Sequence, residues 1–254
     1  MVTDYRLKEL VSPSRRGKIL LPMIAHSPAL ERGLWAIEKD VIDEALRITT
    51  AAVSTGDAAT MIDSDWIEAV LGYVKRRGPN LQKLFADEGK RHTAAFTAGA
   101  KRALGVDLSA IVRDADLDDY VVRASERASG LITNMSTELA HKVAEATRTS
   151  VIRGGSASSL SEVIAQITEV SKSRAKLIAS DQTGKVTSDI TRIRHIQAGV
   201  TTYIWRTSHD ERVRARHREL DGRTYSYDEQ TGAEEGLPPG QPIRCRCIAQ
   251  GIVE

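Results

Sequence analysis

The stretch Gly199-Val-Thr-Thr-Tyr-Ile-Trp-Arg-Thr207 decides the fold class, because the hydrophobic pattern of the chain changes there. Before it, apolar residues recur at steps of three and four, as on one face of an α-helix. Within it, β-branched and aromatic residues dominate, which is typical of a strand. After it, glycine and proline become frequent, and Ile243 to Ile248 alternates like a second short strand. We therefore expect a mainly α protein, with a helical N-terminal region followed by a small α+β C-terminal module.

Start and stop signals divide the N-terminal region, residues 1–155, into four amphipathic helices. The signals are Pro28 and Ser64 as starts, Gly78-Pro79 and Gly105 as stops, Asp116 as an N-cap, and Gly154-Gly155 as the final stop. Apolar stripes rich in alanine and leucine run along these helices. Such stripes are far more often packed core than ligand sites, so we expect a bundle, or helices that pack on partner proteins.

The second region, residues 156–254, begins with further helix. Ser159-Leu-Ser-Glu162 is a capping-box pattern and predicts a short helix. A longer helix is expected from about Ser173 to Gln197, just before the predicted strand. We therefore place a helical region at 1–155 and a separate module at 156–254.

Composition indicates a folded globular protein without naming a function. The chain has 254 residues, enough for one or two hydrophobic cores, with 41% apolar and 28% charged residues. Aromatic residues make up only 4%, which favours helix-on-helix packing over a β-sandwich. The net charge of +2 is far from that of a dedicated nucleic-acid coat.

Targeting signals are missing from the sequence pattern. No apolar run approaches the roughly 18 residues of a membrane span. Asp4 and Glu9 stand where a signal peptide would need a basic and then an apolar segment. We expect a protein made in the cytoplasm with no membrane partner. Cys245 and Cys247 lie too close together in sequence to link distant parts of the chain by a disulfide.

Polar, chemistry-bearing residues are dense between Trp205 and Gly222 and again at Cys245-Arg-Cys247. A small module would not select so many of them for packing alone. If Cys245 and Cys247 lie on a strand, both side chains point to the same face and could offer two thiolates to one ion.

Zinc is the metal that such a ligand set favours, because thiolates and imidazole suit it and a small module gains folding energy from it. His217 is the third candidate ligand, and Asp210 or His209 a fourth. The Cys-x-Cys spacing is tighter than that of most zinc sites. The alternative is that Cys245 and Cys247 are small buried apolar residues and His217 bonds to the backbone.

A metal-dependent nuclease or other hydrolase is a second hypothesis. Asp210, His209 and His217 could serve as base and metal ligands beside phosphate-binding arginines. No second acidic cluster lies at an interpretable spacing, however, and the roles of a complete mechanism cannot all be assigned. We therefore do not expect an enzyme.

Positive charge is concentrated in one part of the chain. Ser171 to Glu219 holds eleven Lys or Arg against five Asp or Glu. The candidate contacts to an acidic partner are Arg206, Arg212, Arg214, Arg216 and Arg218. A non-specific DNA-binding module and an acidic protein partner both fit this pattern, as does a solvated surface whose charges pair within the chain. No motif for reading base sequence is present.

These motifs, taken in order, resemble the phage Mu protein F-like minor head proteins. The resemblance rests on Ser173-Arg-Ala-Lys-Leu-Ile-Ala-Ser-Asp-Gln182, Ala198-Gly-Val-Thr-Thr-Tyr-Ile-Trp205, Asp210-Glu-Arg-Val-Arg214, His217, Leu220-Asp-Gly222, Pro239-Gly240 and Cys245-Arg-Cys247. One departure lies at Ala179-Ser-Asp-Gln182, where the family pattern is closer to Ala-Arg-Thr-Glu. The N-terminal helices match only in being helical.

The resemblance implies a structural, low-copy protein of tailed-phage heads. Its expected partners are the portal protein, the major capsid protein and packaged DNA. Its expected location is the virion, in the capsid interior near the portal vertex, after assembly in the host cytoplasm. Its expected role is head assembly and DNA packaging or delivery.

Overall fold

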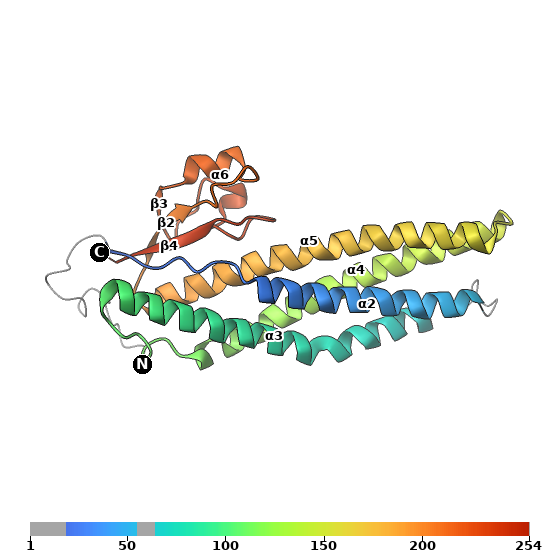
Figure 1. The fold of residues 1–254 in the computed structure, drawn as a ribbon, viewed down its shortest axis with the longest axis horizontal. Helices are drawn as coiled ribbons and strands as arrows, with labels where there is room; N and C mark the ends of the chain where they lie inside the picture. Colours follow the sequence, from blue (N-terminus) through green and yellow to red (C-terminus); the bar gives the residue numbers. More distant parts are fainter. Residues whose placement is uncertain (1–18, 55–63, 254) are drawn as a thin grey trace. The chain divides into compact units, whose positions relative to one another are not determined.

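A computed structural model describes residues 19–54 and 64–253 of the chain and confirms the predicted fold class (Figure 1). The α-helices are α2 (Pro28–Ser54), α3 (Ser64–Leu104), α4 (Asp118–Ile152), α5 (Ala157–Gln197) and α6 (Ala215–Leu220). The described residues also form the short 3₁₀ helices η2 (Asp114–Leu117) and η3 (Glu234–Gly236). The strands are β1 (Ile19–Leu20), β2 (Thr202–Arg206), β3 (Thr224–Ser226) and β4 (Ile248–Val253).

The chain divides into two compact units, and neither is continuous in sequence. Unit 1 combines residues 19–28, Ala86–Val121 and residues 180–253. Unit 2 combines Ala29–Phe85 and Val122–Ala179. The domain boundary predicted near residue 155 falls in the turn between α4 and α5, and it stays a prediction.

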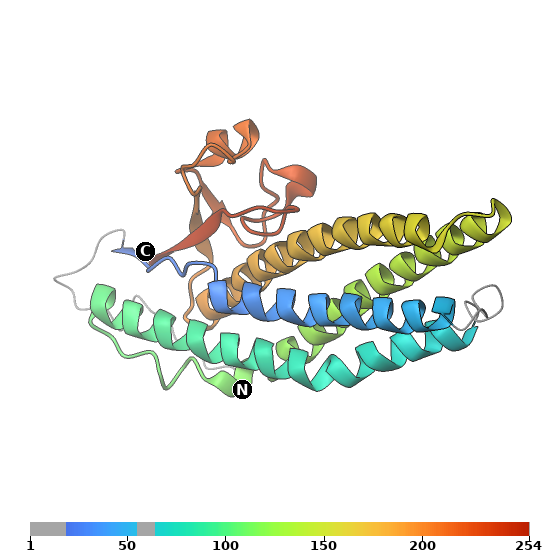
Figure 2. The same ribbon diagram turned by 45° about the vertical axis from the view of Figure 1, so that its right-hand side comes forward.

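Unit 2 is a bundle of four helical segments that run side by side in both Figure 1 and Figure 2. Its core takes small and medium apolar residues from every segment, among them Ile42, Ala45, Val70, Met135 and Ala175. The stripe predicted on α4 is largely buried here, so it is core. Alanine on these faces lets the helices pack closely, as the low aromatic content predicts.

Gly78-Pro79 does not stop a helix, contrary to the prediction. The helix α3 passes through Pro79 and ends only at Leu104. Proline removes one backbone hydrogen bond, yet a helix can continue when its apolar face is covered on both sides of the break. Val74 and Leu81 flank Pro79 and are both buried. The later stop was correct, because Gly105 has a φ of 75° and its N–H donates to the Lys101 carbonyl at 2.9 Å.

The predicted break between two C-terminal helices is also wrong. One continuous helix, α5, replaces them, and its start is capped by Ser156, whose Oγ accepts the Ser159 N–H at 3.1 Å. Asp116 lies in η2, where its carboxylate accepts the Arg113 N–H at 3.1 Å, so it is not the N-cap of α4. Gly154, with a φ of 64°, lies just beyond the end of α4 as predicted.

Unit 1 contains an antiparallel sheet of order β1-β4-β2-β3, drawn in orange and red apart from the blue β1 (Figure 1). The predicted strand is present as β2, in which Tyr203 pairs with Gly251 and Trp205 with Ala249. One core cluster of this unit includes Leu21, Phe96 and Val253.

None of the helices formed by residues 19–54 and 64–253 combines the length and apolar character that crossing a membrane requires. The signal-peptide expectation concerns Asp4 and Glu9, which lie outside the described residues.

Candidate metal centre

The two cysteines lie on an irregular loop rather than on a strand, which corrects the prediction for Ile243 to Ile248. The strand β4 begins only at Ile248. Arg244 has a φ of 57°, a left-handed conformation outside the extended region of regular strands. The Cys245 N–H donates to the Pro242 carbonyl at 2.9 Å, and the Cys247 N–H donates to the Cys245 sulfur at 3.4 Å. A turn, not the alternation of a strand, therefore brings the two thiols together.

One face of α5 holds this loop in place. Asp181, Gly184 and Ser188 lie on this face, at successive steps of three and four residues. Asp181 Oδ1 accepts the Arg244 N–H at 2.7 Å. Ser188 Oγ donates to the Pro239 carbonyl at 2.7 Å. Between them, Gly184 leaves room for the loop, because a Cβ atom there would lie 3.1 Å from the Cys245 carbonyl oxygen. The helix thus fixes the loop backbone on both sides of the turn.

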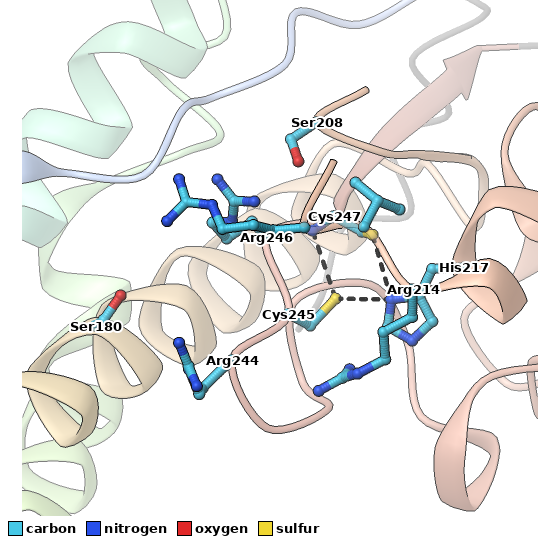
Figure 3. A pocket seen from close by; sticks show the side chains of 10 residues that line it. Ser180, Ser208, Arg214, His217, Arg244, Cys245, Arg246 and Cys247 are labelled. Atoms are coloured by element: carbon cyan, nitrogen blue, oxygen red, sulfur yellow. Dashed lines mark hydrogen bonds between the residues drawn. The ribbon is translucent and has the colours of Figure 1, made fainter. Parts of the chain in front are cut away.

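His217 comes from α6 and meets both sulfurs (Figure 3). Its Nδ1 lies 3.6 Å from the Cys245 Sγ and 3.6 Å from the Cys247 Sγ. All three side chains are buried, and their ligand atoms lie within 4.8 Å of one another. The structure therefore assembles three of the four predicted ligand residues.

Two residues that sequence reasoning missed surround the imidazole of His217. Glu234 Oε2 lies 2.7 Å from Nε2, and the indole of Trp205 meets the ring edge-on with centroids 5.3 Å apart. The Trp205 N–H is buried and has no nitrogen or oxygen acceptor among the described residues. Its interaction with the Cys247 thiol lowers the pKa of that thiol, against the larger effects that raise it. No spacing rule links position 217 to position 234, so only the fold could reveal the Glu234 contact.

Hydrogen bonds make Cys245 the more acidic thiol of the pair. The Cys247 side chain, followed by the backbone N–H groups of Cys247 and Gly240, lowers the pKa of Cys245 to about 6 against the effect of burial. The bond to Cys245 and then burial raise the pKa of Cys247. This buried network of hydrogen bonds stabilises a thiolate at Cys245.

Asp210 and His209 do not join the three clustered side chains. Asp210 accepts hydrogen bonds from the Arg246 side chain and, at 3.0 Å, from the Arg212 N–H. The side chain of His209 is 71% exposed and lies 3.7 Å from Asp221. Among the described residues, the arrangement of Asp210, His209 and His217 that a hydrolase would need is not assembled.

The predicted contact arginines are mostly exposed, but several make bonds within the chain. Arg206 donates to the Gln250 side chain at 2.8 Å, and Arg218 to the Glu211 carbonyl at 3.3 Å. Arg214 lies 3.5 Å from Glu234. The remaining two are Arg212, which lines a pocket, and Arg216, which donates to the Gly232 carbonyl.

A pocket of about 390 Å³ adjoins the cluster (Figure 3). It reaches the clustered side chains His217, Cys245 and Cys247, and its rim is strongly basic. Its four arginines are Arg212, Arg214, Arg244 and Arg246. An anionic or neutral ligand could therefore approach the cluster from solvent.

Fold and site together define a helical protein that carries a compact α+β module with a buried histidine and cysteine cluster. Residues 141–250 match the family model for phage Mu protein F like proteins, which confirms the predicted resemblance. The match includes His217, Cys245 and Cys247.

A comparison with curated proteins gives one relative, an uncharacterised protein of Haemophilus influenzae. It is 29% identical over 177 residues, which cover 69% of this chain. The chain matches only 39% of that protein's length. No solved structure matches the chain.

Proposed function

We propose that this chain is a structural minor head protein of a tailed bacteriophage, which binds other head components during capsid assembly. The family match over residues 141–250 carries this proposal. That segment holds most of the sheet, the short helix α6 and the loop with both cysteines. The finer role that we propose is association with the portal and the inner face of the capsid, in DNA packaging or delivery.

A structural role accounts for the site better than a hydrolase does. His217, Cys245 and Cys247 are buried among core residues that include Trp205 and Leu220. Asp210, the acid that a hydrolase would require beside His217, is bound to Arg246 instead. This burial and this ion pair support a role for the three side chains in stabilising the module.

Exposed apolar side chains at one end of α4 support contact with a protein partner. Val151 and Ile152 are 62% and 85% exposed, side by side at the turn before α5. Contact with a partner would remove this apolar surface from water. Basic residues near the pocket, such as Arg212 and Arg244, offer a second surface, suited to acidic protein or DNA.

Co-purification tests the proposal. The chain is expressed with the portal and major capsid proteins of a tailed phage, and the assembled heads are isolated and analysed by mass spectrometry and electron microscopy. We expect the chain in the heads at fewer copies than the capsid protein, and malformed or empty heads when it is omitted. Normal heads that neither contain nor need the chain would refute the proposal.

DNA contact and DNA cleavage are tested on the purified chain with plasmid DNA and magnesium or zinc. A backbone-driven DNA contact should weaken steeply as salt rises. Cleavage that His217→Ala abolishes would replace the structural proposal with an enzymatic one.

A further inference from the structure

We propose that His217, Cys245 and Cys247 bind one zinc ion, through Nδ1 of the imidazole and the two thiolate sulfurs. This site is independent of the head-protein role, since it follows from the side-chain geometry alone. Two thiolates and one imidazole are a ligand set that zinc favours in proteins.

The distances within the cluster fit a tetrahedral zinc ion. Zinc lies about 2.3 Å from a thiolate sulfur and about 2.0–2.1 Å from an imidazole nitrogen, and a tetrahedral angle then separates sulfur and nitrogen by about 3.6 Å. The structure has the Nδ1 of His217 at 3.6 Å from each sulfur. An ordinary apolar packing of the two cysteines would not require both sulfurs to lie at this distance from one nitrogen.

The contact between His217 and Glu234 sets the tautomer that metal binding requires. A carboxylate can only accept a hydrogen bond, so Nε2 carries the proton and donates it to Glu234 Oε2 at 2.7 Å. The lone pair is then on Nδ1, the atom that faces both sulfurs. A carboxylate bonded to the second nitrogen is the usual partner of a zinc-bound histidine.

The fourth position of the ion opens toward the arginine-lined pocket. Among the described residues, no fourth His, Cys, Asp or Glu joins the cluster. The pocket reaches all three ligand residues, so we infer that a water molecule completes the coordination in the isolated chain. Zinc binds both sulfurs as thiolates, so any proton still on a thiol leaves to solvent, and no electron transfer is involved.

Metal analysis of the full chain, purified under reducing conditions from zinc-supplemented cells, tests the site. We expect about one zinc per chain by elemental mass spectrometry, and X-ray absorption with two sulfur and two nitrogen or oxygen neighbours. Replacement of zinc by cobalt should give sulfur-to-cobalt charge-transfer bands and intense tetrahedral d–d absorption. The unsubstituted chain suffices for these measurements, so a variant that fails to fold cannot obscure the result.

Variants then assign the ligands. Cys245→Ser, Cys247→Ser and His217→Ala should each abolish stoichiometric zinc. The matched controls His209→Ala and Asp210→Asn change neighbouring residues outside the cluster and should keep it. Glu234→Gln should retain the cobalt spectrum while weakening zinc affinity about 10–100-fold.

Two results would overturn the site. The first is a folded full chain that takes up no zinc or cobalt and whose melting temperature is the same with zinc and with chelator. The second is zinc that persists at full stoichiometry in Cys245→Ser and Cys247→Ser. The first outcome would leave a thiol–imidazole hydrogen bond as the explanation of the 3.6 Å distances, and the head-assembly test would be unaffected.

Discussion

Asp181 on α5 accepts a hydrogen bond at 2.7 Å from the backbone N–H of Arg244, the residue whose positive φ turns the cysteine loop. The side chain of Asp181 is 14% exposed and also lies 2.8 Å from Lys185. The bond satisfies a backbone donor at the point where the loop leaves extended geometry. Asp181 belongs to the Ala179-Ser-Asp-Gln182 stretch, so this part of α5 anchors the cysteine loop.

Asp181→Ala should therefore loosen the cysteine loop. Loss of a hydrogen bond from a backbone donor to a charged acceptor costs about 1.5–3 kcal/mol. We expect a matching fall in the free energy of unfolding by urea denaturation, together with faster alkylation of Cys245 and Cys247. Asp181→Asn keeps an acceptor oxygen and should lose less. Alkylation at the native rate in Asp181→Ala would show that the loop does not depend on this bond.

Gly184→Ala should destabilise the chain although alanine is the better helix former. Its Cβ would lie 3.1 Å from the Cys245 carbonyl oxygen, a backbone atom that cannot move without shifting the loop. Gly130→Ala is the matched control, because a Cβ at Gly130 in α4 meets nothing within 4 Å. We expect a gain of about 0.5–1 kcal/mol in Gly130→Ala from helix propensity. Equal gains in both variants, measured by urea denaturation, would contradict the close approach.

The buried carboxyl group of Glu38 should make the folded chain less stable as the pH rises. Burial raises the pKa of this α2 carboxyl to about 8 from an ordinary value of 4.5, and its Oε2 has no hydrogen-bond partner within residues 19–54 and 64–253. The folded state then holds a proton that the unfolded state releases, so stability falls as pH rises from about 4.5 to about 8. Glu38→Gln should remove that slope and raise stability by on the order of 1–3 kcal/mol at pH 8.

Thermal melts of Glu38→Gln between pH 5 and pH 8 measure this effect. Glu145→Gln, at an exposed position of α4, is the control and should leave the pH profile unchanged. A profile for Glu38→Gln that runs parallel to that of the native chain would refute the assignment.

The buried imidazole of His195 should make the folded chain less stable as the pH falls into the acid range. It is fully buried beside Tyr227, whose hydroxyl lies 2.6 Å from Nδ1, and burial lowers its pKa from 6.5 to about 3. The unfolded chain takes up a proton that the folded chain excludes, so stability is lost as pH falls from about 6.5 toward 3. His195→Asn should reduce this slope, even if the smaller side chain lowers stability at neutral pH by about 1–3 kcal/mol.

Chemical denaturation at pH 7 and pH 4.5 separates the two effects of His195→Asn. His141→Gln, on the exposed side of α4, serves as the control. If the loss of unfolding free energy between pH 7 and pH 4.5 is the same in His195→Asn as in the native chain, other groups cause the acid sensitivity. His92 is one such group, because burial lowers its pKa to about 3.

The secondary structure could be predicted from the sequence where one local signal determined it. The β-branched run that contains Tyr203 formed β2, and the positive φ at Gly105 ended α3. The prediction failed where tertiary packing outweighed a local signal. At Pro79 the helix α3 continues, because apolar residues on both sides of the proline are buried. The prediction failed again at Arg244, because a left-handed arginine has no signature in the sequence.

The residues of the candidate site could also be predicted from the sequence only in part. Residue types, together with the expected strand alternation at Cys245 and Cys247, led to the prediction that these cysteines and His217 bind one ion. The structure brings the three side chains together, but through a turn rather than a strand. Asp210 was a reasonable fourth ligand by proximity in sequence, but its bond with Arg246 directs it elsewhere. Glu234 became visible only through the fold, because a contact between residues on different elements follows no helical or strand period.

The sheet order sets the timing of folding. The strand β4 lies between β1 and β2, and the Gln250 side chain donates to the Leu21 carbonyl, 229 positions away in the chain. A ribosome making this protein therefore exposes β1 and β2 long before their shared neighbour exists. Pairings over such separations form slowly, while local helix pairs form earlier. We therefore expect the helices of unit 2 to pack during synthesis and the sheet of unit 1 to be completed only after β4 has been made.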